Sequence, residues 1–202
     1  MRFYLTVLLV WGLVALPTSA DPVTPPADSG AYQFNNEKSS MTVSGSSNVR
    51  DWAMDVTQIN GSVLLGDEQA KLPSIDEIQV EVAVENMVSD KDRLQRHAHD
   101  ALKKEDYPTI SFASSDVQVS SAQADSFSVV ANGKLTIKGN TQTVELTAKG
   151  VQQSDGTLHV KGEHGLKLST FDVERPSLMF GAIKVDDPIQ IGFDVVLAPR
   201  SP

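Results

Sequence analysis

The sequence predicts an all-β domain, built on an antiparallel sheet, with one inserted α-helix. Apolar residues alternate with polar ones along several segments, turn-forming pairs separate these segments, and one stretch follows a helical period instead. Such alternation is typical of antiparallel strands with one buried face. The clearest alternating segments span residues 78–85, 109–113, 144–149, 158–168 and 189–197. About eight to ten strands are expected, and a sheet of that size closes into a barrel or folds into a sandwich.

Turn-forming residues separate the alternating segments, as expected for hairpin connections. They are Asn60-Gly61, Gly66-Asp67, Gly139-Asn140, Asp155-Gly156 and Asp186-Asp187-Pro188. The pair Asn132-Gly133 lies inside an alternating segment, so it forms either a hairpin turn or a β-bulge.

Residues 90–104 break the strand pattern and predict the one helix. The stretch contains no β-branched residue, and its apolar side chains share one helical stripe. Ser89 or Asp90 can cap the start by accepting hydrogen bonds from free backbone N–H groups, and Pro108 stops any continuation. The stripe consists of Leu94, Ala98, Ala101 and Leu102.

The first twenty residues predict a cleaved secretory signal. Arg2 precedes an apolar run over residues 3–16, and small residues follow up to an expected cut after Ala20. A transmembrane anchor is the alternative, but the run is shorter than the roughly 20 residues of a spanning helix. Residues 21–30 hold three prolines and predict a flexible leader, which leaves residues 31–198 as the folded domain.

Charge and cysteine content exclude several classes of protein. The 202 residues carry a net charge of −9, which becomes −10 without the signal, because Arg2 is its only charged residue. Such an acidic chain is not expected to bind nucleic acid. No cysteine is present, which excludes disulfides, thiolate metal sites, a cysteine nucleophile and a lipoprotein acyl anchor. An exported protein without disulfides fits the bacterial periplasm as well as the outside of the cell.

Four groups of residues, in chain order, resemble the YceI-like family from about residue 32 to residue 197. They are SGSSNVRDW at 44–52; RHAHDAL at 96–102 with YPTISF at 107–112; NGKLTIKG at 132–139 with TVEL at 143–146; and FDVERPS at 171–177 with MFG at 179–181. The resemblance implies a lipocalin-like antiparallel barrel of about eight strands, exported to the periplasm. It also implies a lumen that in some members holds a polyisoprenoid chain, such as a quinone tail. Family members often carry histidines near the first strand, whereas residues 35–41 here contain none. Polar contacts from such histidines to a ligand head group are therefore absent.

No catalytic or metal site is expected. Val49 occupies the position where a nucleophile elbow starting at Gly45 needs a second glycine, and no phosphate-binding loop is present. His97 and His99 lie on different faces of the predicted helix, and His159 and His164 lie on opposite faces of a strand. Surface and rim histidines are the expectation, and the protein is not expected to be an enzyme.

The expected function is to hold an apolar chain, an isoprenoid or another lipid, in the barrel lumen. The candidate lining is Met54, Val82, Val84, Phe112, Leu146, Leu168, Met179, Phe180 and Phe193. The alternative is a barrel filled by these same side chains, acting as an exported stress or scaffold protein through protein contacts. Trp52 and Tyr107 either guard a barrel mouth or belong to the core. No cofactor beyond such a lipid and no membrane span is expected, and a homodimer stays open.

Overall fold

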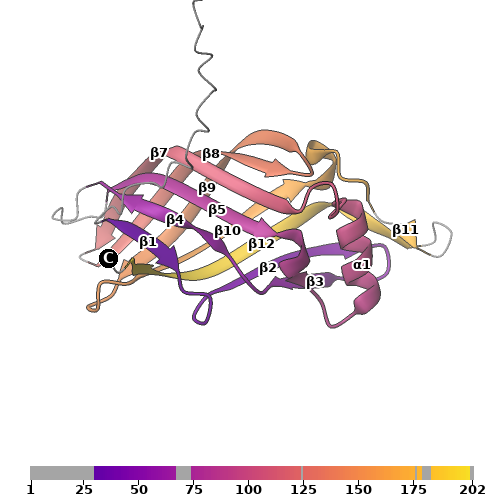
Figure 1. Ribbon diagram of the computed structural model, residues 1–202, viewed down its shortest axis with the longest axis horizontal. Coiled ribbons are helices and arrows are strands. Elements are labelled where there is room, and N and C mark those ends of the chain that lie inside the picture. Colours follow the sequence, from indigo (N-terminus) through magenta and orange to yellow (C-terminus); the bar gives the residue numbers. More distant parts are fainter. Residues whose placement is uncertain (1–29, 67–73, 124, 176, 179–182, 201–202) are drawn as a thin grey trace, which may run out of the picture.

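The computed structural model describes residues 30–66, 74–123, 125–175, 177–178 and 183–200. Its strands form a closed antiparallel barrel with the order β1-β4-β5-β7-β8-β9-β10-β12, and β12 pairs back onto β1 (Figure 1). The predicted all-β barrel of about eight strands is therefore confirmed, in its closed form and not as a sandwich. The expected signal peptide and nearly all of the leader lie outside the described residues.

Three of the eight barrel positions are occupied by strands that are each broken in two. β2 continues β1 along β12, β3 precedes β4, and β6 follows β5. The strands are β1 (Ala31–Phe34), β2 (Ser40–Ser47), β3 (Trp52–Val56), β4 (Asn60–Leu65), β5 (Ile75–Ala83), β6 (Met87–Val88), β7 (Thr109–Gln123), β8 (Ser126–Ile137), β9 (Asn140–Gln152), β10 (Leu158–Lys167), β11 (Ser177–Leu178) and β12 (Ile183–Pro199). Short 3₁₀ turns η1 (Val84–Asn86) and η2 (Leu168–Phe171) complete the chain with one helix, α1 (Asp92–Ala101).

The alternation seen in the sequence becomes the inner and outer faces of the barrel. Along β8, Phe127, Val129, Ala131, Leu135 and Ile137 are buried, while the residues between them are more exposed. A strand repeats its side-chain direction every two residues, so one apolar set per strand faces the lumen.

The helix is shorter than predicted and begins differently. It spans Asp92–Ala101, after Lys91 at the N-cap position, where no side chain caps the helix. The Ser89 hydroxyl instead accepts the backbone N–H of Lys91, which forms a turn before the helix. The helix lies at the end of the barrel away from the C-terminus, close to β3 (Figure 1).

Three expected turn signals lie inside strands. Asn60-Gly61 is not a turn but the start of β4, where it pairs with Glu81 and Val80 of β5; the connection from β3 lies just before it, at residues 57–59. Asn132-Gly133 belongs to β8, and the bulge is on β7, whose register shifts between Ala113 and Asp116 opposite this pair. Asp186-Asp187-Pro188 is a bulge within β12, between Val185 and Ile189, and not the turn expected from the sequence. A bulge accommodates residues that cannot continue the ladder, proline among them, without ending the strand.

The two ends of the barrel differ. At the end with the C-terminus, Tyr32, Val63, Phe127, Leu158 and Leu197 are all buried, and the Tyr32 hydroxyl donates to the carbonyl oxygen of Gly156. At the opposite end the wall consists of α1, η2 and the β2–β3 connection.

Candidate functional site

The barrel contains two adjoining apolar cavities. The first, here called the mouth cavity, has a volume of about 520 Å³ and lies at the α1 end. The second, the deep cavity, has a volume of about 190 Å³ and lies further inside the barrel. Four side chains line both cavities: Met41, Val82, Ile110 and Ile191. The cavities therefore adjoin across a short apolar constriction, one side of which is a flexible methionine.

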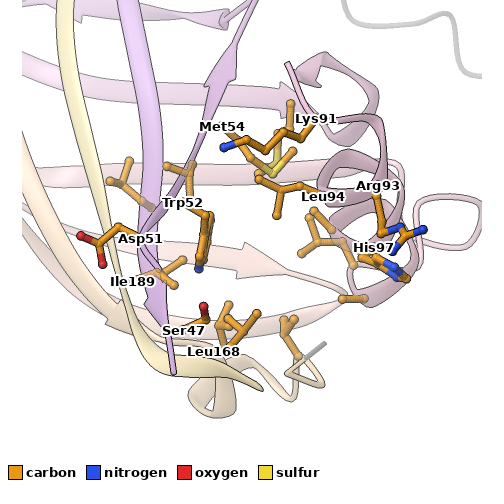
Figure 2. Close-up of a pocket in the computed structure, with 18 of the residues that line it drawn as sticks. Ser47, Asp51, Trp52, Met54, Lys91, Arg93, Leu94, His97, Leu168 and Ile189 are labelled. Atoms are coloured by element: carbon orange, nitrogen blue, oxygen red, sulfur yellow. The ribbon is translucent and has the colours of Figure 1, made fainter. Parts of the chain in front are cut away.

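The helix forms one wall of the mouth cavity. Leu94, His97, Ala98 and Ala101 line it from α1, and Figure 2 shows Leu94 directed across the hollow toward β3. No residue of α1 is fully buried. An amphipathic helix ordinarily buries its apolar stripe against the protein. Here that stripe borders empty space, which is the arrangement expected of a helix that covers a ligand.

The opposite wall consists of β2, β3 and β12. Met54 is buried, and Trp52 packs against Gly45, where a Cβ atom would lie 2.5 Å from the indole ring. The indole N–H of Trp52 donates to the carbonyl oxygen of Ser46 at 3.1 Å, so the ring is held flat against the wall. Trp52 is thus half-buried: it lines the mouth cavity and also packs against the core, so it combines the two roles considered for it. Tyr107 is exposed and lines neither cavity.

Charged residues line only the outer part of the mouth cavity. They are Arg50, Asp51, Lys91, Asp92 and Arg93, all of them exposed. Figure 2 shows the Lys91 side chain extending across the cavity toward Met54. The mouth therefore joins a solvated rim to an apolar interior.

Inward-facing glycines keep the deep cavity open. Phe127 lies over Gly150, and Phe193 lies over Gly162, where added Cβ atoms would approach the rings to 2.2 and 2.5 Å. Phe112 covers Gly133 in the same way. Each ring lies against the barrel wall where a side chain is missing. The aromatic residues thus line the lumen without filling it.

Among the described residues, two polar ones line the deep cavity, Ser111 and His164. His164 is half-buried, and its imidazole makes no hydrogen bond or ion pair with the described part of the chain. Burial lowers the pKa of His164 below its ordinary value of 6.5. The sequence placed His159 and His164 on opposite strand faces, and the structure agrees. It assigns His164, however, to the lumen and not to the surface or rim.

Six of the nine predicted lining residues border a cavity. Met54 and Leu168 line the mouth cavity; Phe112, Leu146 and Phe193 line the deep cavity; Val82 lines both. Val84 is buried in η1 but lines neither cavity. Met179 and Phe180 lie outside the described residues.

Sequence reasoning missed the lining from α1, from the middle of β12, and His164. The helical stripe was visible in the sequence, but nothing there showed that it faces a cavity. Ile189 and Ile191 carried the same alternation as Phe193 and could have been included on that ground.

His97 lines the mouth cavity, and the other two histidines contact other parts of the fold. His99 Nε2 contacts the carbonyl oxygen of Met87 at 2.9 Å, and His159 pairs with Asp194 on the outside of the barrel. The Asp194 pKa is lowered by hydrogen bonds from Lys161 and His159. Within the described ranges, no group of three His, Asp or Glu residues could hold a metal ion. In the same part of the chain, no helix is long and apolar enough to cross a membrane.

The closed antiparallel sheet and its apolar lumen define a hollow lipocalin-like barrel. A family model described as "YceI-like domain" matches residues 32–197. The chain therefore belongs to the YceI-like family. No curated protein was found to match it.

Several solved structures share this fold. BcnA of Burkholderia cenocepacia is 22% identical with a TM-score of 0.61, over 81% of this chain and 98% of that one. A polyisoprenoid binding domain from Saccharophagus degradans, implicated in plant cell wall breakdown, is 13% identical with a TM-score of 0.66, over 85% and 99%. The Campylobacter jejuni YceI protein is 16% identical with a TM-score of 0.56, over 74% and 85%. At these identities the likeness concerns the fold alone.

Proposed function

We propose that this protein binds an apolar chain, an isoprenoid or another lipid, inside the barrel and acts as a carrier without catalysis. The observation that carries the proposal is the pair of adjoining cavities, about 520 and 190 Å³, lined almost entirely by apolar side chains. The larger one alone lies within the range of roughly 300–1,000 Å³ typical of small-molecule sites. The polyisoprenoid-binding description of one structural neighbour supports the same ligand class.

The energetics favour a chain over a compact ligand. Burial of one five-carbon isoprene unit contributes roughly 3–4 kcal/mol, at about 0.8 kcal/mol per carbon. Association and ordering cost about 4–15 kcal/mol, so several units in the lumen outweigh that cost without a charged anchor. The histidines absent from residues 35–41 are therefore not needed for affinity.

The alternative, a scaffold with a filled barrel, is less consistent with the hollow lumen. Protein interiors ordinarily contain few voids larger than a water molecule. A volume of about 520 Å³ beside a helix with no fully buried residue exceeds such packing defects by far.

We place the mature protein in the periplasm. The predicted signal over residues 1–20 supports export, and membership in the YceI-like family agrees with it. A carrier there would shield an apolar chain from water between membranes.

Native mass spectrometry of protein purified from its own periplasm, followed by organic extraction, tests the proposal. We expect a stoichiometric isoprenoid or fatty chain with the folded protein. An apo mass under gentle conditions, with no uptake of added quinone or long-chain lipid, would favour the scaffold instead.

A further inference from the structure

His164 occupies an unusual position for a histidine. It faces inward from β10, between the inward residues Val160 and Leu166, and it lies opposite Ile191 of β12. All other described residues that line the deep cavity are apolar, except Ser111. A polar ring therefore interrupts the apolar wall at the end of the deep cavity that adjoins the mouth cavity, because its neighbour Ile191 lines both cavities.

The imidazole of His164 lacks a protein partner in the described part of the chain. A neutral imidazole has one N–H donor and one acceptor nitrogen. A polar group that is half-buried and stays unpaired raises the free energy of the folded state. Nearly all such groups in native proteins therefore form a hydrogen bond with protein, water or a ligand. The partner of His164 must therefore come from whatever occupies the cavity.

The local wall leaves room for such a partner. β9 and β10 pair only from Leu158 to Gly162, so the ladder between them ends two residues before His164. The deep cavity is lined from both sides of this point, by Leu146 and Ala148 of β9 and by Val160 and His164 of β10. A polar group can lie there while its chain runs along the lumen.

The chemistry of the partner follows from the surroundings. No other titratable side chain lines the deep cavity among the described residues, so no fixed charge opposes or attracts an ion there. Burial lowers the pKa of His164, which keeps the ring neutral at neutral pH. A neutral donor and acceptor in an apolar wall match an uncharged hydrogen-bonding group, whereas an anion would remain buried without a countercharge.

We propose that His164 is a ligand-binding residue, whose imidazole pairs with a hydroxyl or carbonyl group of an uncharged amphiphile held in the lumen. The assignment rests on the proposed function and narrows it: the preferred ligand is an isoprenoid alcohol, phenol or quinone, in preference to a bare hydrocarbon or a phosphorylated chain.

Paired ligands test this assignment. We would measure how well geranylgeraniol displaces the uncharged dye N-phenyl-1-naphthylamine from wild-type protein and from two variants. The hydrocarbon with the same chain but no hydroxyl would be measured in the same way. His164→Leu removes the hydrogen-bonding group but keeps an apolar side chain, and His164→Gln keeps a neutral donor and acceptor. His159→Gln is the matched control, because His159 lies on the outer face of the same strand.

We expect His164→Leu to weaken alcohol binding about three- to tenfold relative to hydrocarbon binding, as for the loss of one hydrogen bond. His164→Gln should restore part of this selectivity, and His159→Gln should not change it. NMR shifts of the His164 ring nitrogens should move with the alcohol and not with the hydrocarbon.

The failures are distinguishable. If both ligands bind and His164→Leu weakens them equally, or the ring nitrogens do not respond, the partner is water; the assignment is then wrong while the proposed function stands. If folded wild-type protein binds neither ligand, the proposed function fails and the assignment fails with it.

Discussion

Individual side chains decide how much of the lumen is free. Phe112 is buried, lines the deep cavity, and lies over Gly133, where a Cβ atom would come within 2.5 Å of its ring. The ring cannot withdraw further toward the wall, so extra volume at this position must enter the lumen.

Phe112→Trp should therefore reduce retention of the apolar chain while leaving the fold nearly intact. Overpacking of this kind costs about 1–3 kcal/mol, part of which is avoided here because the adjoining space is empty. The measurement is the lipid content per protein after purification. Circular dichroism checks that the variant is folded. Phe112→Leu is the control, since it leaves the lumen at least as large. Unchanged retention in Phe112→Trp would mean that the chain does not reach this part of the barrel.

The protonation of His164 provides a second residue-scale prediction. Its folded pKa lies below the ordinary value of 6.5, so the unfolded chain takes up a proton first as the pH falls. Protonation of His164 therefore lowers the free energy of unfolding as the pH falls from about 7 toward the folded pKa. Below the folded pKa, His164 causes no further change.

The free energy of unfolding, measured with urea, should fall more between about pH 7.5 and about pH 5.5 for wild-type protein than for His164→Leu. Comparison with the variant cancels the contributions of all groups that the two proteins share. Asp155, Asp187 and Asp194 do not interfere, because their lowered pKa values confine their loss of stabilisation to pH below about 4. Equal losses in the two proteins would contradict the lumen position of His164.

At the scale of elements, α1 lines the mouth cavity with apolar residues that are only half-buried at the edge of the core. Leu94 is half-buried and directed into the mouth cavity (Figure 2), whereas Arg96 is exposed. We expect Leu94→Gln to weaken binding of an apolar chain roughly tenfold, through lost apolar contact of about 1–1.5 kcal/mol. The free energy of unfolding of ligand-free protein should change by less than about 1 kcal/mol.

Arg96→Gln, on the same helix, is the control and should affect neither quantity. Dye displacement and urea unfolding measure the two effects separately. A large loss of stability without a change in affinity would instead identify α1 as an ordinary core helix.

A second element-scale feature holds the mouth end together. Lys138, at the turn between β8 and β9, is buried, and its Nζ donates to the carbonyl oxygen of Asp172, just after η2. The side-chain amide of Asn140 donates to the carbonyl oxygen of Phe171 at 3.0 Å. The Lys138 contact joins two of the groups of residues through which the sequence resembles the family, 132–139 and 171–177.

Lys138→Met keeps the apolar stem but removes the charged donor, so it should lower the free energy of unfolding by about 1.5–3 kcal/mol. Lys149→Met, at an exposed position of β9, should change it little. Urea unfolding of ligand-free protein measures both. Equal effects would show that the Lys138 contact adds no stability beyond a surface lysine.

At the scale of the whole molecule, the alternation of apolar and polar residues predicted most of the fold. It placed Phe112, Leu146 and Phe193 on inner faces, because side-chain direction along a strand depends only on sequence parity. The alternation could not show that the barrel is hollow. The free volume depends on the glycines that lie opposite aromatic rings on neighbouring strands, as Gly150 lies opposite Phe127. The register that creates these pairs involves residues far apart in the chain.

The errors have two causes. His164 has the same parity as Leu158, Val160 and Leu166, so the alternation that predicted the strand could also have placed it on the inner face, where the structure has it. Asp186-Asp187-Pro188 has the composition of a turn, but partners on β10 and β2 keep β12 continuous through the bulge. Local preference predicts a break there, and tertiary pairing overrides it.

A ligand in the lumen should stabilise the barrel as a whole, because the unfolded chain has no cavity to bind it. Stabilisation follows mass action and reaches about 2.7 kcal/mol at a free ligand concentration of 100 times Kd. For a domain of this size that corresponds to roughly 5–10 °C in Tm. We expect delipidated protein to melt lowest, and its Tm to rise with the logarithm of added geranylgeraniol. His164→Leu should show a smaller rise at each alcohol concentration but the same rise with the matched hydrocarbon. A Tm that is independent of both ligands would mean that the cavities are filled by side-chain rearrangement in solution, and the scaffold interpretation would then account better for this fold.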